Sequence, residues 1–176
     1  MKVYQLDPDK SKIKWSSQIG DQSIHGEFHG LDGNIVSDLG EITGGNISVD
    51  LKTITITDTA LTEEQKDLID QAIKKSPIIK GDDSVVNFKF EEIISNPDHD
   101  LIKGILMISN QAFGMDVVAN FNQTESELVA RGKMDVQSSN PVLIQELVNL
   151  YDHELDEDKN INSFNIECEL VASESE

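Results

Sequence analysis

Polar and apolar residues alternate along most of this sequence, and no other feature constrains the fold as strongly. In an extended strand successive side chains point to opposite faces, so a period of two predicts strands with one face in a core and the other in water. Clusters of Gly, Asn and Asp, such as residues 31–34, separate the alternating segments and predict turns. About eight short strands of this kind favour an antiparallel barrel or a sandwich. The alternating segments are residues 11–15, 24–28, 47–51, 86–90, 115–121, 128–136 and 163–170.

Two segments depart from this alternation and predict helices. Thr62 and Gln65 have the spacing of a capping box. The apolar residues around them fall on one helical face: Leu61, Leu68, Ile69, Ala72 and Ile73. Asn140 and Pro141 can begin a second helix over residues 142–151, with leucines along one stripe. We therefore expect a mostly β protein with one or two short helices.

The length of 176 residues predicts a single domain over residues 1–176, with an acidic Ser/Glu tail from about residue 172. The chain has 33 Asp and Glu against 14 Lys and Arg, a formal net charge of -19. Such a surface repels phosphate backbones and anionic headgroups, so binding to nucleic acid and docking on membrane surfaces are disfavoured. No apolar run reaches the ~18–20 residues of a membrane span, and no leader precedes Tyr4. We expect a cytoplasmic protein, or a periplasmic one if a leader has been removed.

The sequence contains no recognisable catalytic motif. It has no Gly-x-Ser-x-Gly elbow and no Gly-rich phosphate loop followed by lysine, and its carboxylates are too numerous for any pair to stand out. We therefore expect neither an enzyme nor a cofactor. The single cysteine, Cys168, excludes an intrachain disulfide, and its place in an alternating run predicts a small buried side chain.

Two patterns resemble metal sites, and both are explained better without a metal. Residues 156–167 follow the spacing of an EF-hand loop, but Ile161 stands where the sharp turn needs glycine, so we interpret the segment as a solvated acidic loop. His25 and His29 are four residues apart, about 13 Å along a regular strand, which is too far for two ligands of one ion. We expect no metal site.

Short motifs in order along residues 4–171 add a family resemblance. The motifs are Tyr4-x-Leu6-Asp7-x-x-x-Ser11-x-Ile13-x-Trp15, Ile24-x-Gly26-x-Phe28, the segment Gly45 to Asp58, Gly104-x-Leu106-x-Ile108, and Gly132 with Met134. In their order and spacing, the chain resembles the YceI-like family. These are bacterial proteins with a lipocalin-like antiparallel β-barrel that bind polyisoprenoids and related long amphipathic lipids. The resemblance implies the same barrel of about eight strands here.

Three positions depart from the family pattern. The aromatic pair that follows the family's helix is replaced near residues 76–80, and the histidine common in that helix falls near Gln71 or Ala72. The D-R-T segment after the penultimate strand is replaced by Gln-Ser-Ser at residues 137–139. The resemblance therefore implies the barrel and its apolar wall, and no headgroup contacts.

A closed sheet of about eight strands has room for side chains or for one small ligand, so its inward residues form either a packed core or the wall of a pocket. The resemblance favours a pocket for one long-chain hydrophobic ligand (a polyisoprenoid, an isoprenoid quinone or a fatty-acyl-like lipid) in a carrier or storage protein. The alternative is an acidic interaction module with a filled barrel that recognises another copy of itself, as a homodimer, or a basic partner, toward which its charge would steer it. The residues expected to form the ligand-binding wall are Trp15, Phe28, Phe88, Phe90, Leu106, Ile108, Val117 and Phe121.

Overall fold

The structure is a computed structural model of the chain, and it describes residues 1–19, 22–75, 84–108, 110–136 and 161–175. These residues form an antiparallel β-barrel closed by eight strands, with one α-helix in the described part of the chain. The predicted barrel is confirmed, whereas the predicted second helix over residues 142–151 lies outside the described residues. The elements are β1 (Lys2–Leu6), β2 (Lys12–Ile19), β3 (Gln22–Phe28), β4 (Gly30–Asp38), β5 (Glu41–Asp50), η1 (Leu51–Thr53), β6 (Thr55–Ile56), α1 (Glu63–Lys75), β7 (Val85–Ser95), β8 (Asp100–Ile108), β9 (Gln111–Gln123), β10 (Glu127–Asp135) and β11 (Ile161–Glu174).

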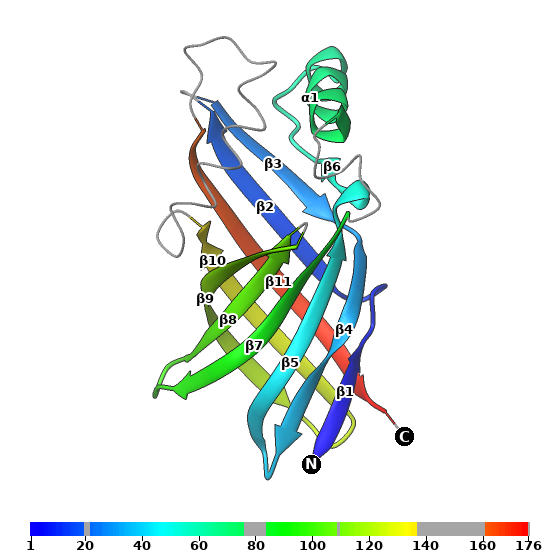
Figure 1. Cartoon of the computed structure of the whole chain (residues 1–176). Coiled ribbons are helices and arrows are strands. Elements are labelled where there is room, and N and C mark those ends of the chain that lie inside the picture. The colour runs from blue at the N-terminus through cyan, green and yellow to red at the C-terminus, as the bar shows by residue number, and fades with distance from the viewer. Residues whose placement is uncertain (20–21, 76–83, 109, 137–160, 176) are drawn as a thin grey trace.

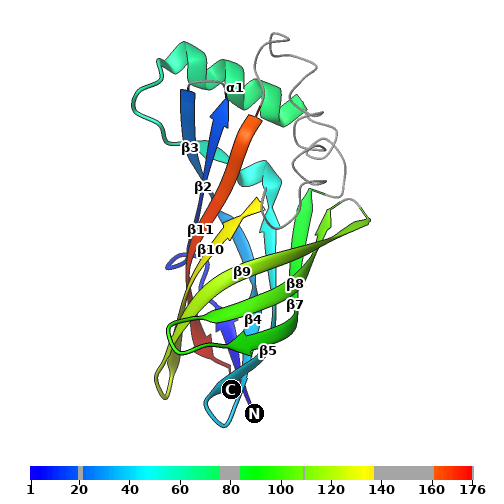
Figure 2. The same ribbon diagram turned by 90° about the vertical axis from the view of Figure 1, so that its left-hand side faces the viewer.

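The strands that close the barrel follow the order β1-β4-β5-β7-β8-β9-β10-β11, and β11 pairs again with β1 (Figure 1). One edge of β11 pairs with β10. The other edge is divided between two strands: residues 172–174 pair with β1, and residues 161–169 pair with β2. β2, β3 and β6 extend the wall where α1 lies, at the opposite end from both chain termini (Figure 2). We call these two ends of the barrel the α1 end and the terminus end.

The break between β1 and β2 is built from residues of the opening motif. The Oδ1 atom of Asp7 accepts hydrogen bonds from the backbone N–H groups of Asp9 (3.1 Å) and Lys10 (3.3 Å), a turn that ends β1. The buried Ser11 then acts as a strand partner: its Oγ accepts from the N–H of Val171 (3.0 Å) and donates to the C=O of Val171 (3.2 Å). The backbone of β11 therefore keeps its hydrogen bonds where its partner changes from β1 to β2.

Helix α1 begins with the predicted capping box. The N–H of Thr62 donates to Oε1 of Gln65 (3.0 Å), and the N–H of Gln65 donates to Oγ1 of Thr62 (3.2 Å). Leu61, just before the helix, is buried, but Leu68 is 62% exposed. The apolar face expected for this helix is therefore not uniformly covered.

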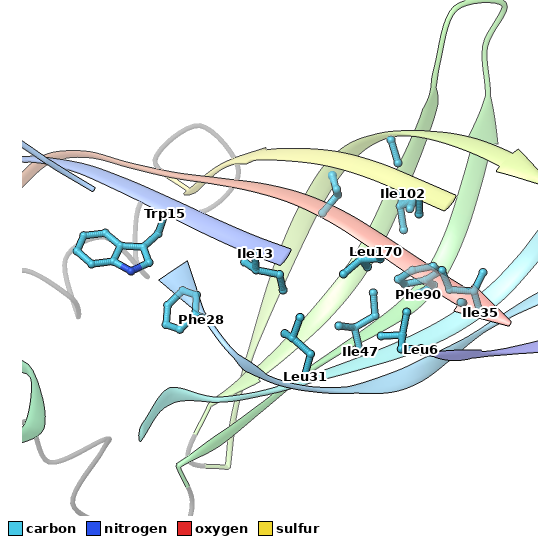
Figure 3. Packing of buried hydrophobic residues seen from close by; sticks show 14 of the residues in the cluster. Leu6, Ile13, Trp15, Phe28, Leu31, Ile35, Ile47, Phe90, Ile102 and Leu170 are labelled. Atoms are coloured by element: carbon cyan, nitrogen blue, oxygen red, sulfur yellow. The ribbon is translucent and has the colours of Figure 1, made fainter. Parts of the chain in front are cut away.

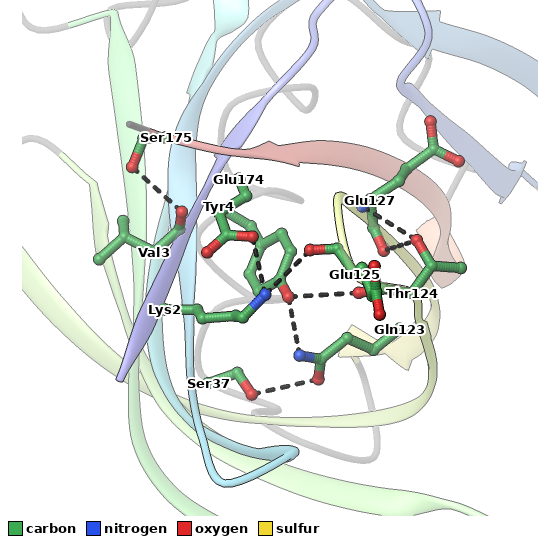
Figure 4. A network of polar contacts seen from close by, with 10 residues as sticks. All are labelled: Lys2, Val3, Tyr4, Ser37, Gln123, Thr124, Glu125, Glu127, Glu174 and Ser175. Atoms are coloured by element: carbon green, nitrogen blue, oxygen red, sulfur yellow. Dashed lines mark hydrogen bonds and ion pairs between the residues drawn. The ribbon is translucent and has the colours of Figure 1, made fainter.

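A polar network occupies the interior at the terminus end (Figure 4). The hydroxyl group of the fully buried Tyr4 accepts a hydrogen bond from Nε2 of Gln123 (2.8 Å), and Oε1 of Gln123 accepts one from the Oγ–H of Ser37 (3.1 Å). Across the adjoining surface Nζ of Lys2 forms an ion pair with Glu174 (2.7 Å). These contacts join four strands of the barrel and seal this end with satisfied polar groups.

The C-terminal strand is longer than expected. The Ser/Glu tail predicted from about residue 172 is wrong at its start, because β11 continues to Glu174. Ala172 is fully buried and lies opposite Leu6 on β1 and Leu128 on β10. Its small side chain fits where three strands meet, so these last residues complete the barrel.

We expect Ala172→Lys to lower the free energy of unfolding by about 3 kcal/mol or more, because it places an unpaired ammonium group in the apolar interior. The matched control is Ser173→Lys on the outward face, which we expect to change the stability by less than about 0.5 kcal/mol. Urea unfolding of both variants measures the difference. Equal effects of the two variants would contradict the closure of the barrel through residue 172.

Candidate functional site

The inward side chains form an apolar interior that runs along the barrel (Figure 3). Trp15 and Phe28 lie near the α1 end, and Leu6 and Ile35 lie near the terminus end. Near the terminus end the packing is tight, since the exposed fraction of Tyr4, Ile35 and Leu128 is 0%. This half of the interior is therefore filled by the protein's own side chains.

At the α1 end the interior is packed differently. Phe113, Met115 and Val136 form a second buried cluster. The apolar side chains packed around this cluster are only half-buried, and the strand pairing shows that they face inward. Leu106 lies opposite Phe113 and Phe88, and Met134 lies two residues from Val136 and opposite Ile166. Ile108 and Phe164 lie two residues from Leu106 and Ile166 on the same strands. These half-buried residues are Phe88, Leu106, Ile108, Met134, Phe164 and Ile166, on β7, β8, β10 and β11. Apolar side chains that face inward and still contact solvent are typical of a pocket wall rather than of a finished core.

All eight residues predicted for the ligand-binding wall contribute to the two clusters. Trp15, Phe28, Phe90 and Val117 are buried in the larger cluster. Phe88 packs against both clusters, and Leu106 and Ile108 pack against the second one. Phe121 lies apart from the others, opposite Ala130 and two residues from Gln123 of the polar network. The contact of these eight residues with a ligand remains a prediction. Phe121 is the least suited to such a contact, because it lies next to the polar network.

Inward-facing glycines, whose role the sequence analysis did not identify, allow aromatic rings to lie against the wall. A Cβ atom built on each of these glycines would overlap a ring on the neighbouring strand, so the ring occupies the space that a side chain would take. The pairs are Gly26 with Trp15, Gly104 with Phe88, and Gly45 with Phe90. Because each ring lies on glycine backbone, its bulk stays close to the wall. Part of the signal was present in the sequence, since Gly26 lies in an alternating segment and Gly104 begins the motif Gly104-x-Leu106-x-Ile108.

Trp15 is held between a glycine and another ring. Its indole stacks on Phe164 of β11, with 6.0 Å between the ring centroids and 8° between the planes. Trp15 is only 3% exposed, and its buried Nε1–H has no hydrogen-bond partner among the described residues. Figure 3 shows the indole on the inner side of β2, with its nitrogen on the edge away from the strand. A buried N–H group without an acceptor costs about 1–3 kcal/mol, so this donor is an exception in the described interior.

Cys168 faces the same part of the interior. It is partly buried and lies opposite Ile13 of β2 and Gly132 of β10. Burial raises the pKa of its thiol to about 11, against a smaller lowering by a hydrogen bond from the Gly132 backbone. The thiol is therefore protonated near neutral pH and acts as an apolar part of the wall.

The two histidines weighed as metal ligands, His25 and His29, are exposed. His25 faces outward on β3, and Nε2 of His29 lies 3.1 Å from Oγ1 of Thr55. Within the described ranges, no three His, Cys, Asp or Glu side chains gather closely enough to hold a metal ion. Of the EF-hand-like segment, residues 156–160 lie outside the described residues, and Glu167 forms an ion pair with Lys133 (3.3 Å).

Comparison with solved structures places the barrel among known folds. BcnA of Burkholderia cenocepacia has a TM-score of 0.71 at 15% identity, over 95% of this chain and 99% of that one. A polyisoprenoid-binding domain from Saccharophagus degradans, implicated in plant cell wall breakdown, has a TM-score of 0.66 at 12% identity, over 99% and 100% of the two chains. The YceI protein of Campylobacter jejuni has a TM-score of 0.50 at 12% identity, over 86% and 85%.

At these identities the likeness establishes the fold: the chain has the barrel of the YceI proteins. The resemblance noted in the sequence is thereby confirmed at the level of the fold. No family model and no curated protein matches the chain. Among the described helices, none is long and apolar enough to cross a membrane.

The raised pKa of Cys168 predicts a pH dependence of stability. The folded state holds the thiol proton up to about pH 11, whereas the unfolded chain releases it near pH 9, so stability falls as the pH rises between these values. Relative to Cys168→Ala, we expect the native protein to lose up to about 2.5 kcal/mol over this window. Urea unfolding of both proteins under reducing conditions measures the difference. A parallel loss in the two proteins would show that the thiol is hydrated in the folded state.

Proposed function

We propose that the barrel binds one long hydrophobic molecule, a polyisoprenoid or fatty-acyl-like lipid, in its interior at the α1 end, and serves as a carrier or storage protein. The observation that carries this proposal is the contrast between the two halves of the interior. Near the terminus end, fully buried side chains and the network of Tyr4, Gln123 and Ser37 fill the barrel. At the α1 end, inward-facing apolar side chains such as Leu106 and Ile166 are only half-buried.

A hydrocarbon chain would complete this unfinished packing. Each methylene group that leaves water contributes about 0.8 kcal/mol, so a chain of ordinary lipid length supplies ample binding energy. The rings of Trp15 and Phe88 lie against glycine backbone, which keeps their bulk near the wall. The fold is also that of a domain described as polyisoprenoid-binding, which supports the same class of ligand for this chain.

Native mass spectrometry of the purified protein, followed by organic extraction, tests the proposal directly. We expect a co-purifying lipid in a one-to-one complex, or, after delipidation, one-to-one uptake of geranylgeraniol delivered from cyclodextrin. Failure to bind either a co-purifying lipid or the added alcohol, with the barrel intact by circular dichroism, would overturn the proposal. It would favour the filled barrel with a protein partner instead.

A pair of adjacent substitutions locates the ligand. Leu106 faces inward and is half-buried, whereas the next residue, Met107, faces outward and is 37% exposed. We expect Leu106→Trp to fill part of the pocket and to weaken geranylgeraniol binding at least about tenfold. This factor corresponds to about two methylene groups of the ligand that can no longer be buried. Met107→Trp should leave the affinity unchanged. Equal affinities of the two variants, both folded, would place the ligand elsewhere.

A further inference from the structure

We propose that the ligand presents an uncharged oxygen, such as a carbonyl, ester or ether oxygen, to Nε1–H of Trp15, and that this donor makes the barrel selective for oxygen-bearing lipids over plain hydrocarbons. This inference rests on the proposed lipid-binding function and deepens it. The starting observation is the buried indole N–H for which the described residues provide no acceptor.

The position of the indole ties this donor to the proposed pocket. Trp15 lies directly opposite Ile166 on β11 and stacks on Phe164, and both of these residues belong to the half-buried lining of the α1 end. Gly26 holds the other side of the ring, since any side chain there would overlap the indole. The buried N–H is therefore fixed in place beside the half-buried side chains of the α1 end, which favours a specific acceptor.

The residues around Trp15 do not supply the acceptor themselves. The nearest buried hydroxyl group on the same face of β2 is that of Ser17, which donates its proton to the C=O of Ser163 (3.0 Å) and is not bonded to the indole. Ile13, Ile24 and Phe28 are apolar neighbours on β2 and β3. The backbone C=O of Thr55 also lies near this side of the ring, and it too makes no hydrogen bond to the indole.

The charges of the barrel favour a neutral oxygen over a carboxylate or a phosphate. Among residues whose burial the structure describes, no Lys or Arg side chain is buried, so no cation is available in that part of the interior. The ion pairs on the neighbouring strands, Arg131 with Glu169 (2.7 Å) and Lys133 with Glu167 (3.3 Å), lie on the outer face. With a net charge of -19, the protein would repel an anionic headgroup that lacked such a partner.

Two probes of equal length separate the hydrogen bond from apolar burial. Heptadecan-2-one has a carbonyl oxygen, and heptadecane has a methylene group in its place; both can be delivered from cyclodextrin to delipidated protein. Because Trp15 is the only tryptophan, an isotope-labelled sample gives a single indole N–H signal in a nitrogen–proton correlation spectrum. We expect the ketone to move this proton downfield and to slow its exchange with solvent, and the alkane to do neither.

Two variants complete the test, with affinities measured by native mass spectrometry. Trp15→Phe keeps a ring over Gly26 and removes the donor, so it should weaken ketone binding about three- to tenfold, the worth of one hydrogen bond, and leave alkane binding nearly unchanged. Phe164→Leu removes the stacked ring and keeps the donor, so it should affect the two probes alike.

The outcomes separate the two proposals. If both probes bind equally to all three proteins and the indole signal does not move with the ketone, the assignment of Trp15 is wrong, while the lipid-binding function stands. If neither probe binds to the folded native protein, the proposed function itself fails. A selective loss of ketone affinity in Trp15→Phe, together with the shifted signal, supports both.

Discussion

The pairing of β11 is the interaction on which the rest of the barrel depends. This strand is hydrogen-bonded to β10 on one edge and to β1 and β2 in turn on the other, so it joins the two ends of the sheet. The change of partner is possible because Ser11 bonds both backbone groups of Val171 at the break. Without this closure the inward faces of the strands would not face one another, and the interior would not exist.

Closure also explains why the two halves of the interior differ. Near the terminus end β1, β4 and β11 converge, and Tyr4, Ile35 and Ala172 fill the space between them completely. At the α1 end the wall is extended by β2, β3 and β6, and aromatic rings lie on glycine backbone. One end is therefore a packed core with a polar seal, and the other end, where inward side chains are half-buried, is where we propose that the ligand binds.

The sequence correctly predicted the features that depend on residues close to one another in the chain. Alternation depends only on the period of a strand, so it correctly placed Trp15, Phe28 and Phe88 on the inward face. The capping box of Thr62 and Gln65 was predictable because its two hydrogen bonds join residues three apart. The prediction was wrong at the C-terminus, since composition there resembles a tail, and only pairing with Leu6 and Leu128 shows that residue 172 belongs to the barrel.

The amino-acid pattern alone was therefore enough to predict an acidic, mostly β chain with an apolar inner face, because side-chain alternation and charge are properties of the chain itself. The tertiary structure decided which of the inward residues are finished core and which form a wall, since burial depends on strands that are distant in sequence. The tertiary structure also decided the polar seal, since Tyr4 and Gln123 are 119 residues apart in the sequence. The same is true of the indole of Trp15, whose unpaired donor exists only because Phe164 and Gly26 enclose it after closure.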